Sequence, residues 1–66
     1  MDEAKNRVFE EKKELEGRLF KLTTFICLSE KYKTLSKLSR KLLKKQEWYM
    51  QKYLNVLKAR LRAWEE

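Results

Sequence analysis

The chain has 66 residues, with 17 Lys and Arg, 10 Asp and Glu, no His, one Cys, one Gly and no Pro, and its formal net charge is +7. These numbers leave room for one small domain, and they exclude an internal disulfide, a zinc site of the Cys/His type and a bilayer-spanning run of about 20 apolar residues. A chain this short buries only about 60% of its unfolded surface, so self-association is the remaining way to stabilise it.

The first half of the chain has the apolar spacing of one long helix, from about residue 2 to residue 29. Five apolar residues follow one another at intervals of seven, four, three and four, which places them on one helical face: Val8, Leu15, Leu19, Leu22 and Ile26. Gly17 lies inside this helix and costs about 1 kcal/mol relative to Ala. It marks either the close approach of a second helix or a tolerated defect.

The second half predicts a helix from about residue 37 to residue 64. One apolar row repeats every seven residues at Leu43, Met50, Leu57 and Trp64, and a second does so at Leu42, Tyr49, Val56 and Ala63. Ser36 or Ser39 suits the N-cap of this helix, because a side-chain oxygen accepts a hydrogen bond from an otherwise unpaired N–H.

The two helices leave a connection over about residues 30–36, which is either a tight turn or a third short helix. The fold class is therefore all-α. We expect residues 1–66 to form one domain, an antiparallel two-helix hairpin that assembles into a homo-oligomeric helical bundle.

A row of polar residues lies between the two apolar rows of the second helix: Gln46, Tyr53 and Arg60 are also seven residues apart. An Arg that faces a core costs several kcal/mol unless it is paired. One interpretation is a set of polar layers that fixes the register of a bundle. The other is a pocket for a nucleotide, in which Arg holds phosphate, Tyr stacks or hydrogen-bonds, and Gln reads a base edge.

Two further residues are candidates for ligand contact. Tyr32, between two lysines, is either a packed anchor at the turn or a platform for a base. Arg7, at the start of the first apolar stripe, is either a surface charge or a group that reaches the partner helix or an anion. With no His, no Gly-rich phosphate loop and no carboxylate pair on the apolar face, the chain is not expected to be an enzyme, and we expect neither a cofactor nor a metal.

The positive charge is concentrated in the middle of the chain. Residues 1–30 sum to −1, residues 31–45 to +7 and residues 46–66 to +1. The basic run is either a solubilising surface or an anion-binding one. A small accessory protein that binds nucleic acid through this run, with steep salt dependence, is thus a second functional class. A helical inhibitor of a host protein is a third.

A single pattern of apolar and polar positions extends over about residues 7–61. They are Arg7, Val8, Glu11, Lys12, Leu15, Leu19, Leu22, Phe25 and Ile26 in the first half, and Leu35, Leu42, Leu43, Gln46, Met50, Tyr53, Leu57, Arg60 and Leu61 in the second. This distributed pattern resembles a widespread family of small helical proteins encoded by bacteriophages. Proteins of this type are associated with sponges that hold cyclic nucleotide signals of bacterial anti-phage immunity, the CBASS systems.

The resemblance implies a phage immune-evasion protein that binds and sequesters a cyclic dinucleotide similar to 3′3′-cGAMP without cleaving it. It also implies a homotetramer without membrane association, at work in the cytoplasm of the infected cell, and the unpaired Cys27 fits a reducing compartment. Carried onto the matching polar positions, it assigns ligand contacts to Arg7, Gln46, Tyr53 and Arg60. Tyr32 joins this set as a second stacking residue.

Overall fold

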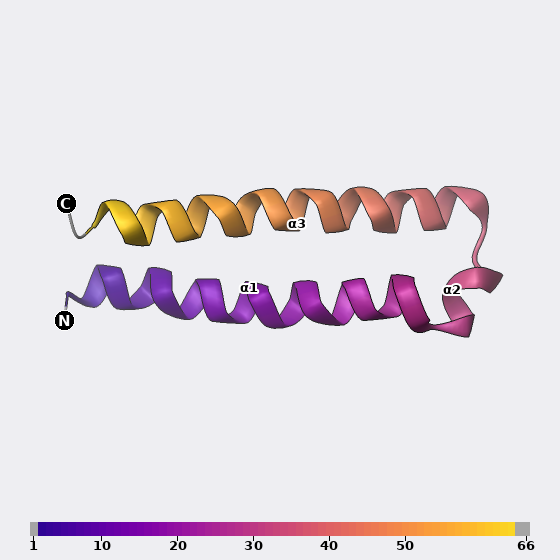
Figure 1. Ribbon diagram of the computed structural model, residues 1–66, viewed down its shortest axis with the longest axis horizontal. Helices are drawn as coiled ribbons and strands as arrows, with labels where there is room; N and C mark the ends of the chain where they lie inside the picture. Colours follow the sequence, from indigo (N-terminus) through magenta and orange to yellow (C-terminus); the bar gives the residue numbers. More distant parts are fainter. Residues whose placement is uncertain (1, 65–66) are drawn as a thin grey trace.

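The structure, a computed structural model, describes residues 2–64 and consists there of three helices (Figure 1). The two long helices are α1, Glu3–Leu28, and α3, Lys37–Ala63, and α2, Glu30–Thr34, is a short helix between them. α1 and α3 run antiparallel, so the start of α1 and the end of α3 lie at the same end of the molecule, opposite the bend at α2 (Figure 1). The predicted all-α hairpin is confirmed, and its connection contains the third short helix.

Side-chain caps set the helix boundaries. Asp2, Ser29 and Ser36 each have an extended backbone and accept a hydrogen bond from a nearby N–H of the following helix, at 3.0, 3.2 and 3.1 Å respectively. Ser36 is therefore the N-cap of α3, and Ser39 donates that N–H. Because Asp2 and Ser29 are caps, α1 begins one residue later and ends one residue earlier than the sequence predicts.

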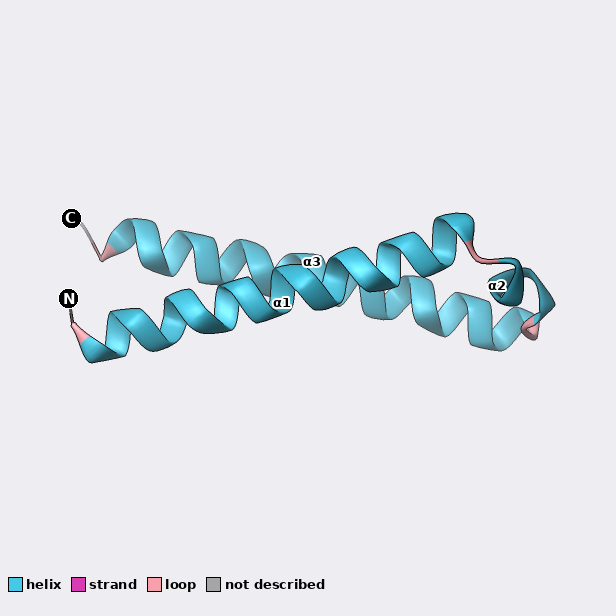
Figure 2. Cartoon of the chain, turned by 90° about the horizontal axis from the view of Figure 1, so that it is seen from below, coloured by secondary structure: helices cyan, strands magenta, loops and turns pink. Residues whose placement is uncertain are grey.

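The core is a single seam between α1 and α3. Its buried residues are Val8, Leu15, Leu19, Leu54 and Leu57, and Met50 and Leu61 pack against them. Leu57 is the most enclosed, with an exposed fraction of 0%. Figure 2 shows the two long helices crossing near their midpoints, so this seam follows a gentle twist along the pair. Five buried side chains form a small core, as the length of the chain predicts.

One hydrogen bond between side chains closes each side of the seam. The Thr23 hydroxyl donates to the Glu47 carboxylate at 2.7 Å, and the Tyr53 hydroxyl donates to the Glu11 carboxylate. At about 100° per residue, Thr23 and Glu11 lie on opposite flanks of the buried stripe of α1. The hairpin therefore has two distinct sides, which we call the Tyr53 side and the Glu47 side.

Candidate ligand-binding site

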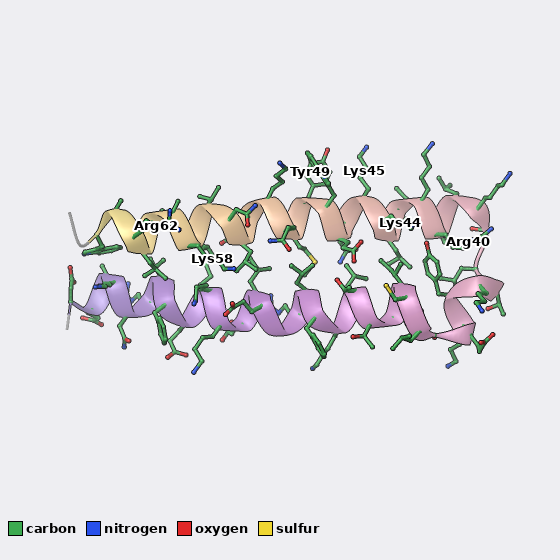
Figure 3. All side chains as sticks on the ribbon, viewed as in Figure 1. Arg40, Lys44, Lys45, Tyr49, Lys58 and Arg62 are labelled. Atoms are coloured by element: carbon green, nitrogen blue, oxygen red, sulfur yellow. The ribbon has the colours of Figure 1, made fainter. Side chains whose placement is uncertain are left out.

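α3 carries a second apolar face that α1 does not cover. It comprises Leu38, Leu42, Tyr49, Tyr53 and Val56, whose exposed fractions run from 45% at Tyr53 to 65% at Leu38. Figure 3 shows Tyr49 projecting from the edge of α3 that lies away from α1. We call these five residues the exposed apolar face. A contiguous apolar surface of this kind is typical of an interaction site.

A hollow of about 600 Å³ lies on this face. It is lined by Leu42, Lys45, Gln46, Tyr49, Met50 and Tyr53. Its volume falls within the range of about 300–1,000 Å³ that is common for small-molecule pockets. Apolar and aromatic walls with a few polar groups, here an amide, an ammonium group and two phenols, match the usual composition of such pockets.

The row Gln46, Tyr53 and Arg60 runs along the Tyr53 side, at the edge where the exposed apolar face meets the buried seam, and Tyr53 belongs to both the row and that face. All three side chains are exposed in the hairpin. The Gln46 amide donates weakly to the sulfur of Met50 at 3.9 Å, and the Tyr53 hydroxyl is held by Glu11. The Arg60 guanidinium has no ion pair or hydrogen bond with any residue from 2 to 64. It is the cation of this row that is available to an anion.

Arg7 lies on the same side, one helical turn before Glu11. By helical rise, Arg7 is about 6 Å from Glu11 along the axis and Arg60 about 10 Å from Tyr53, in the same direction because the helices are antiparallel. The structure thus brings Arg7 to the Arg60 end of the row. Arg7 is ion-paired with Glu3 at 3.3 Å, and the hollow beside it is lined by further carboxylates. A phosphate would have to compete with them.

Tyr32 lies apart from the row, at the bend of the hairpin. Its ring meets the Phe25 ring edge-on with centroids 6.1 Å apart, and its hydroxyl donates to the carbonyl of Arg40 at 3.3 Å. These contacts are those of a packed anchor. Within one chain the structure does not bring Tyr32 to Gln46: the Tyr32 hydroxyl reaches the carbonyl of Arg40, and Gln46 lies six residues, or about 9 Å by helical rise, farther along α3.

Sequence reasoning missed several residues of the hollow. Leu42, Lys45 and Tyr49 line it, and Glu11 fixes the Tyr53 hydroxyl. The signal for Leu42 and Tyr49 was present in the second seven-residue row. It was assigned to packing, because spacing alone does not say which of two apolar rows the partner helix covers.

Comparison with known proteins gives one result for almost the whole chain. The model of the Sequestin family matches residues 2–63. This chain belongs to the Sequestin family. The family name fits a sponge-like protein, since it indicates a role in binding and holding a molecule rather than in catalysis. No curated protein and no solved structure matched the chain.

Two further features were sought among the described residues: a membrane-spanning helix and a group of metal ligands. None of the helices within residues 2–64 is long and apolar enough to cross a bilayer. Over the same residues, no three His, Cys, Asp or Glu side chains gather in a group that could hold a metal ion.

Proposed function

We propose that this chain is a phage immune-evasion protein that binds a cyclic dinucleotide of the 3′3′-cGAMP type and holds it without cleaving it. Its setting is the cytoplasm of an infected bacterium, where the ligand is the second messenger of CBASS signalling. The observation that carries the proposal is the polar row Gln46, Tyr53 and Arg60 beside an apolar hollow. A nucleotide needs all three chemistries: a cation for phosphate, an aromatic ring for a base face and an amide for a base edge.

The exposed apolar face supports the second part of the proposal, that the chain forms a homo-oligomer. A second copy of the chain that packs on this face removes Leu42, Tyr49 and Val56 from water, which one hairpin leaves exposed. An interface with two-fold symmetry uses the same surface on both copies, so it places two copies of the polar row opposite each other. Two such pairs form the homotetramer of this proposal.

A symmetric pocket suits this class of ligand. A cyclic dinucleotide has two phosphates and two bases, and a two-fold site supplies two Arg60 guanidinium groups and two Tyr53 rings. Arg7 adds a cation at the same end of the row when phosphate displaces Glu3. Tyr32 contributes only if another copy brings its bend to the ligand.

The mechanism is stoichiometric sequestration. Each bound messenger is withdrawn from the effector it would activate, so the protein acts through affinity and number of sites. The ligand should therefore be recovered unchanged after the protein is denatured.

The decisive experiment is calorimetric titration with a panel of cyclic dinucleotides, together with Arg60→Ala and its matched control Arg62→Ala. Arg62 is an exposed Arg on the same helix, two residues away and on another face. We expect Arg60→Ala to abolish binding and Arg62→Ala to leave it intact. At 100 times its dissociation constant, a ligand adds about 2.7 kcal/mol of stability, which raises the melting temperature by several degrees.

Three outcomes contradict the proposal. One is wild-type protein that binds no cyclic dinucleotide, and another is equal loss of binding in the two Arg variants. The third is loss of the oligomer together with binding in Arg60→Ala, measured by light scattering against four chains of 8.2 kDa. That third result supports the alternative interpretation, in which Arg60 belongs to a structural polar layer.

A further inference from the structure

The Glu47 side of α3 carries a second polar row, which the proposed sponge does not use. Four cations follow one another along it, at Arg40, Lys44, Lys58 and Arg62, as Figure 3 shows. Between the two pairs, Trp48, Gln51 and Asn55 continue the same face at spacings of three and four. We call these seven residues the basic row. The basic row is longer than the basic run at residues 31–45. Lys58 and Arg62 lie outside that run in the sequence, but the turn of the helix places them on the same face as Arg40 and Lys44.

The cations of this row lack acidic partners. α3 contains nine Lys and Arg and a single acidic residue, Glu47. Every ion pair found within residues 2–64 joins two residues of α1 or two residues of α2. In addition, the Nε of Arg40 is buried and has no hydrogen-bond partner among the described residues. On α3 itself, an anion that reaches this face meets a single carboxylate, Glu47, whose Oε2 accepts a hydrogen bond from the Thr23 hydroxyl.

The length of the row fits a polymer. Arg40 and Arg62 are 22 positions apart, which is about 33 Å by helical rise. Phosphates follow one another about every 3.4 Å along one strand of a stacked nucleic acid, so about ten phosphates match this length. A cyclic dinucleotide carries two and spans only part of the row.

The middle of the row is suited to an unpaired base. Trp48 is 55% exposed, and it borders a hollow of about 510 Å³ together with Lys44 and Gln51 from α3 and Leu19 and Thr23 from α1. The Lys52 ammonium lies over the Trp48 ring, 5.0 Å from its centroid, so a cation already occupies one face of the aromatic platform and a base would stack on the other. An aromatic face next to a cation is the usual arrangement for stacking successive bases of a single strand, whose base faces a duplex would hide.

From these observations we infer that the basic row is a second binding surface, for single-stranded DNA or RNA, independent of the cyclic dinucleotide site. Lys and Arg at its two ends neutralise the backbone, and Trp48 stacks on a base between them. Because the contacts are to phosphates and to a base face, binding is expected to be strong at low salt and nearly independent of sequence.

The test is fluorescence anisotropy with labelled 15-nucleotide oligothymidylate and oligouridylate, and with a duplex of equal length, between 50 and 200 mM NaCl. Lys44→Gln combined with Lys58→Gln should lower the salt slope by about 1.4, since each contact to a single strand contributes about 0.7. Lys13→Gln combined with Lys21→Gln removes the same charge from exposed positions of α1 and should leave the slope unchanged. Trp48→Ala should weaken single-strand binding at least about fivefold, with Trp64→Ala as control.

Several results overturn the inference. They are no binding of either oligonucleotide at 50 mM NaCl, equal weakening by the α1 and α3 lysine pairs, and tighter binding of the duplex with no effect of Trp48→Ala. Binding to phosphatidylserine vesicles without binding to oligonucleotides assigns the row to a membrane surface instead. The two sites are separable, because Arg60→Ala and an excess of cyclic dinucleotide should both leave oligonucleotide binding unchanged.

Discussion

α1 and α3 are nearly equal in length, at 26 and 27 residues, but they use their surfaces differently. α1 has one apolar stripe, which packs on α3, and its six Lys and Arg stand among five Glu. Three ion pairs link these charges within the helix: Arg7–Glu3, Lys12–Glu16 and Arg18–Glu14. α3 has two apolar faces, of which α1 covers one, and nine bases against one acid.

This difference separates a supporting helix from a binding helix. α1 buries its stripe and pairs much of its charge inside one hairpin. α3 leaves an apolar face and a line of cations without partners among residues 2–64, and the proposals above assign both surfaces to other molecules. Substitutions on the outer face of α1 should therefore have small effects, and substitutions around α3 should affect folding, assembly or binding according to the face they change.

The largest effect is expected at the face of α3 that α1 covers. Leu57→Ala removes the most enclosed side chain of the core and should cost about 2–5 kcal/mol of folding free energy. In a domain of this size the melting temperature should fall by about 8 °C or more, as measured by circular dichroism. Lys58→Ala changes an exposed neighbour and should have little effect. Equal losses in the two variants would mean that the α1–α3 seam does not stabilise the fold.

A substitution on the exposed apolar face should change the oligomeric state rather than the helix content. Val56→Asp places a charge in the proposed contact between copies and should dissociate the oligomer, as seen by light scattering, while the helical signal persists. Asn55→Asp adds the same charge to the basic row and should leave the oligomer intact. An oligomer that survives Val56→Asp contradicts the assignment of this face to self-association.

The bridge between the two helices on the Tyr53 side should have an intermediate effect. Tyr53→Phe removes the hydrogen bond to Glu11 and should cost about 0.5–1.5 kcal/mol in urea unfolding. Tyr49→Phe is the matched control, because the Tyr49 hydroxyl has no hydrogen-bond partner within residues 2–64. In a Glu11→Gln background the cost of Tyr53→Phe should shrink, and an unchanged cost would exclude the bridge.

At Gly17 we expect a substitution to stabilise the fold rather than destabilise it. Apart from its chain neighbours and the backbone of its own helix, no atom lies within 4 Å of the position that a Cβ would take there, so the glycine does not permit a close approach of α3. Within one hairpin, this finding excludes the close approach of α3 and leaves the tolerated defect. Gly17→Ala should raise the free energy of unfolding by about 0.5–1 kcal/mol, measured in urea. A loss of stability would reveal a partner at this position in the oligomer.

The smallest effect is expected at the exposed ion pairs of α1. Glu14→Gln breaks the contact with Arg18, which is 3.9 Å long and exposed on both sides. It should cost less than about 0.5 kcal/mol, and 0.5 M NaCl should remove the difference from wild type. A larger loss that persists in salt would mean that α1 is not the passive helix of the pair.

Local patterns predicted most of the hairpin. The spacing of Val8, Leu15 and Leu19 predicted the buried stripe of α1, and the row with Leu43, Met50 and Leu57 was one of two candidate rows of α3 for packing on it. The capping role of Ser36 followed from its hydroxyl. These features depend on residues within one or two turns of each other, where helical geometry relates sequence spacing to position.

The site was predicted less completely. The sequence placed Gln46, Tyr53 and Arg60 on one row. In the structure Gln46 and Tyr53 line the hollow at Tyr49, and Arg60 lies about 10 Å beyond Tyr53 along α3. Tyr32 was grouped with them by residue type, whereas the bend holds it against Phe25 and Arg40. Arg7 reached the Arg60 end of the row only because the antiparallel pairing brings the two helix ends together.

The heptad and helical spacings, the caps and the charge balance of the chain established two long helices, a short connection and the polar row of α3. Those properties depend on residues close in the sequence, so they do not change with the way in which the helices pack. Which apolar row of α3 is buried, that Tyr53 meets Glu11, and that the basic row borders a hollow at Trp48 were decided by the packing of α1 on α3. Such contacts join residues more than 20 positions apart, and their geometry is set by the register and side of the helix pair, which no local spacing specifies.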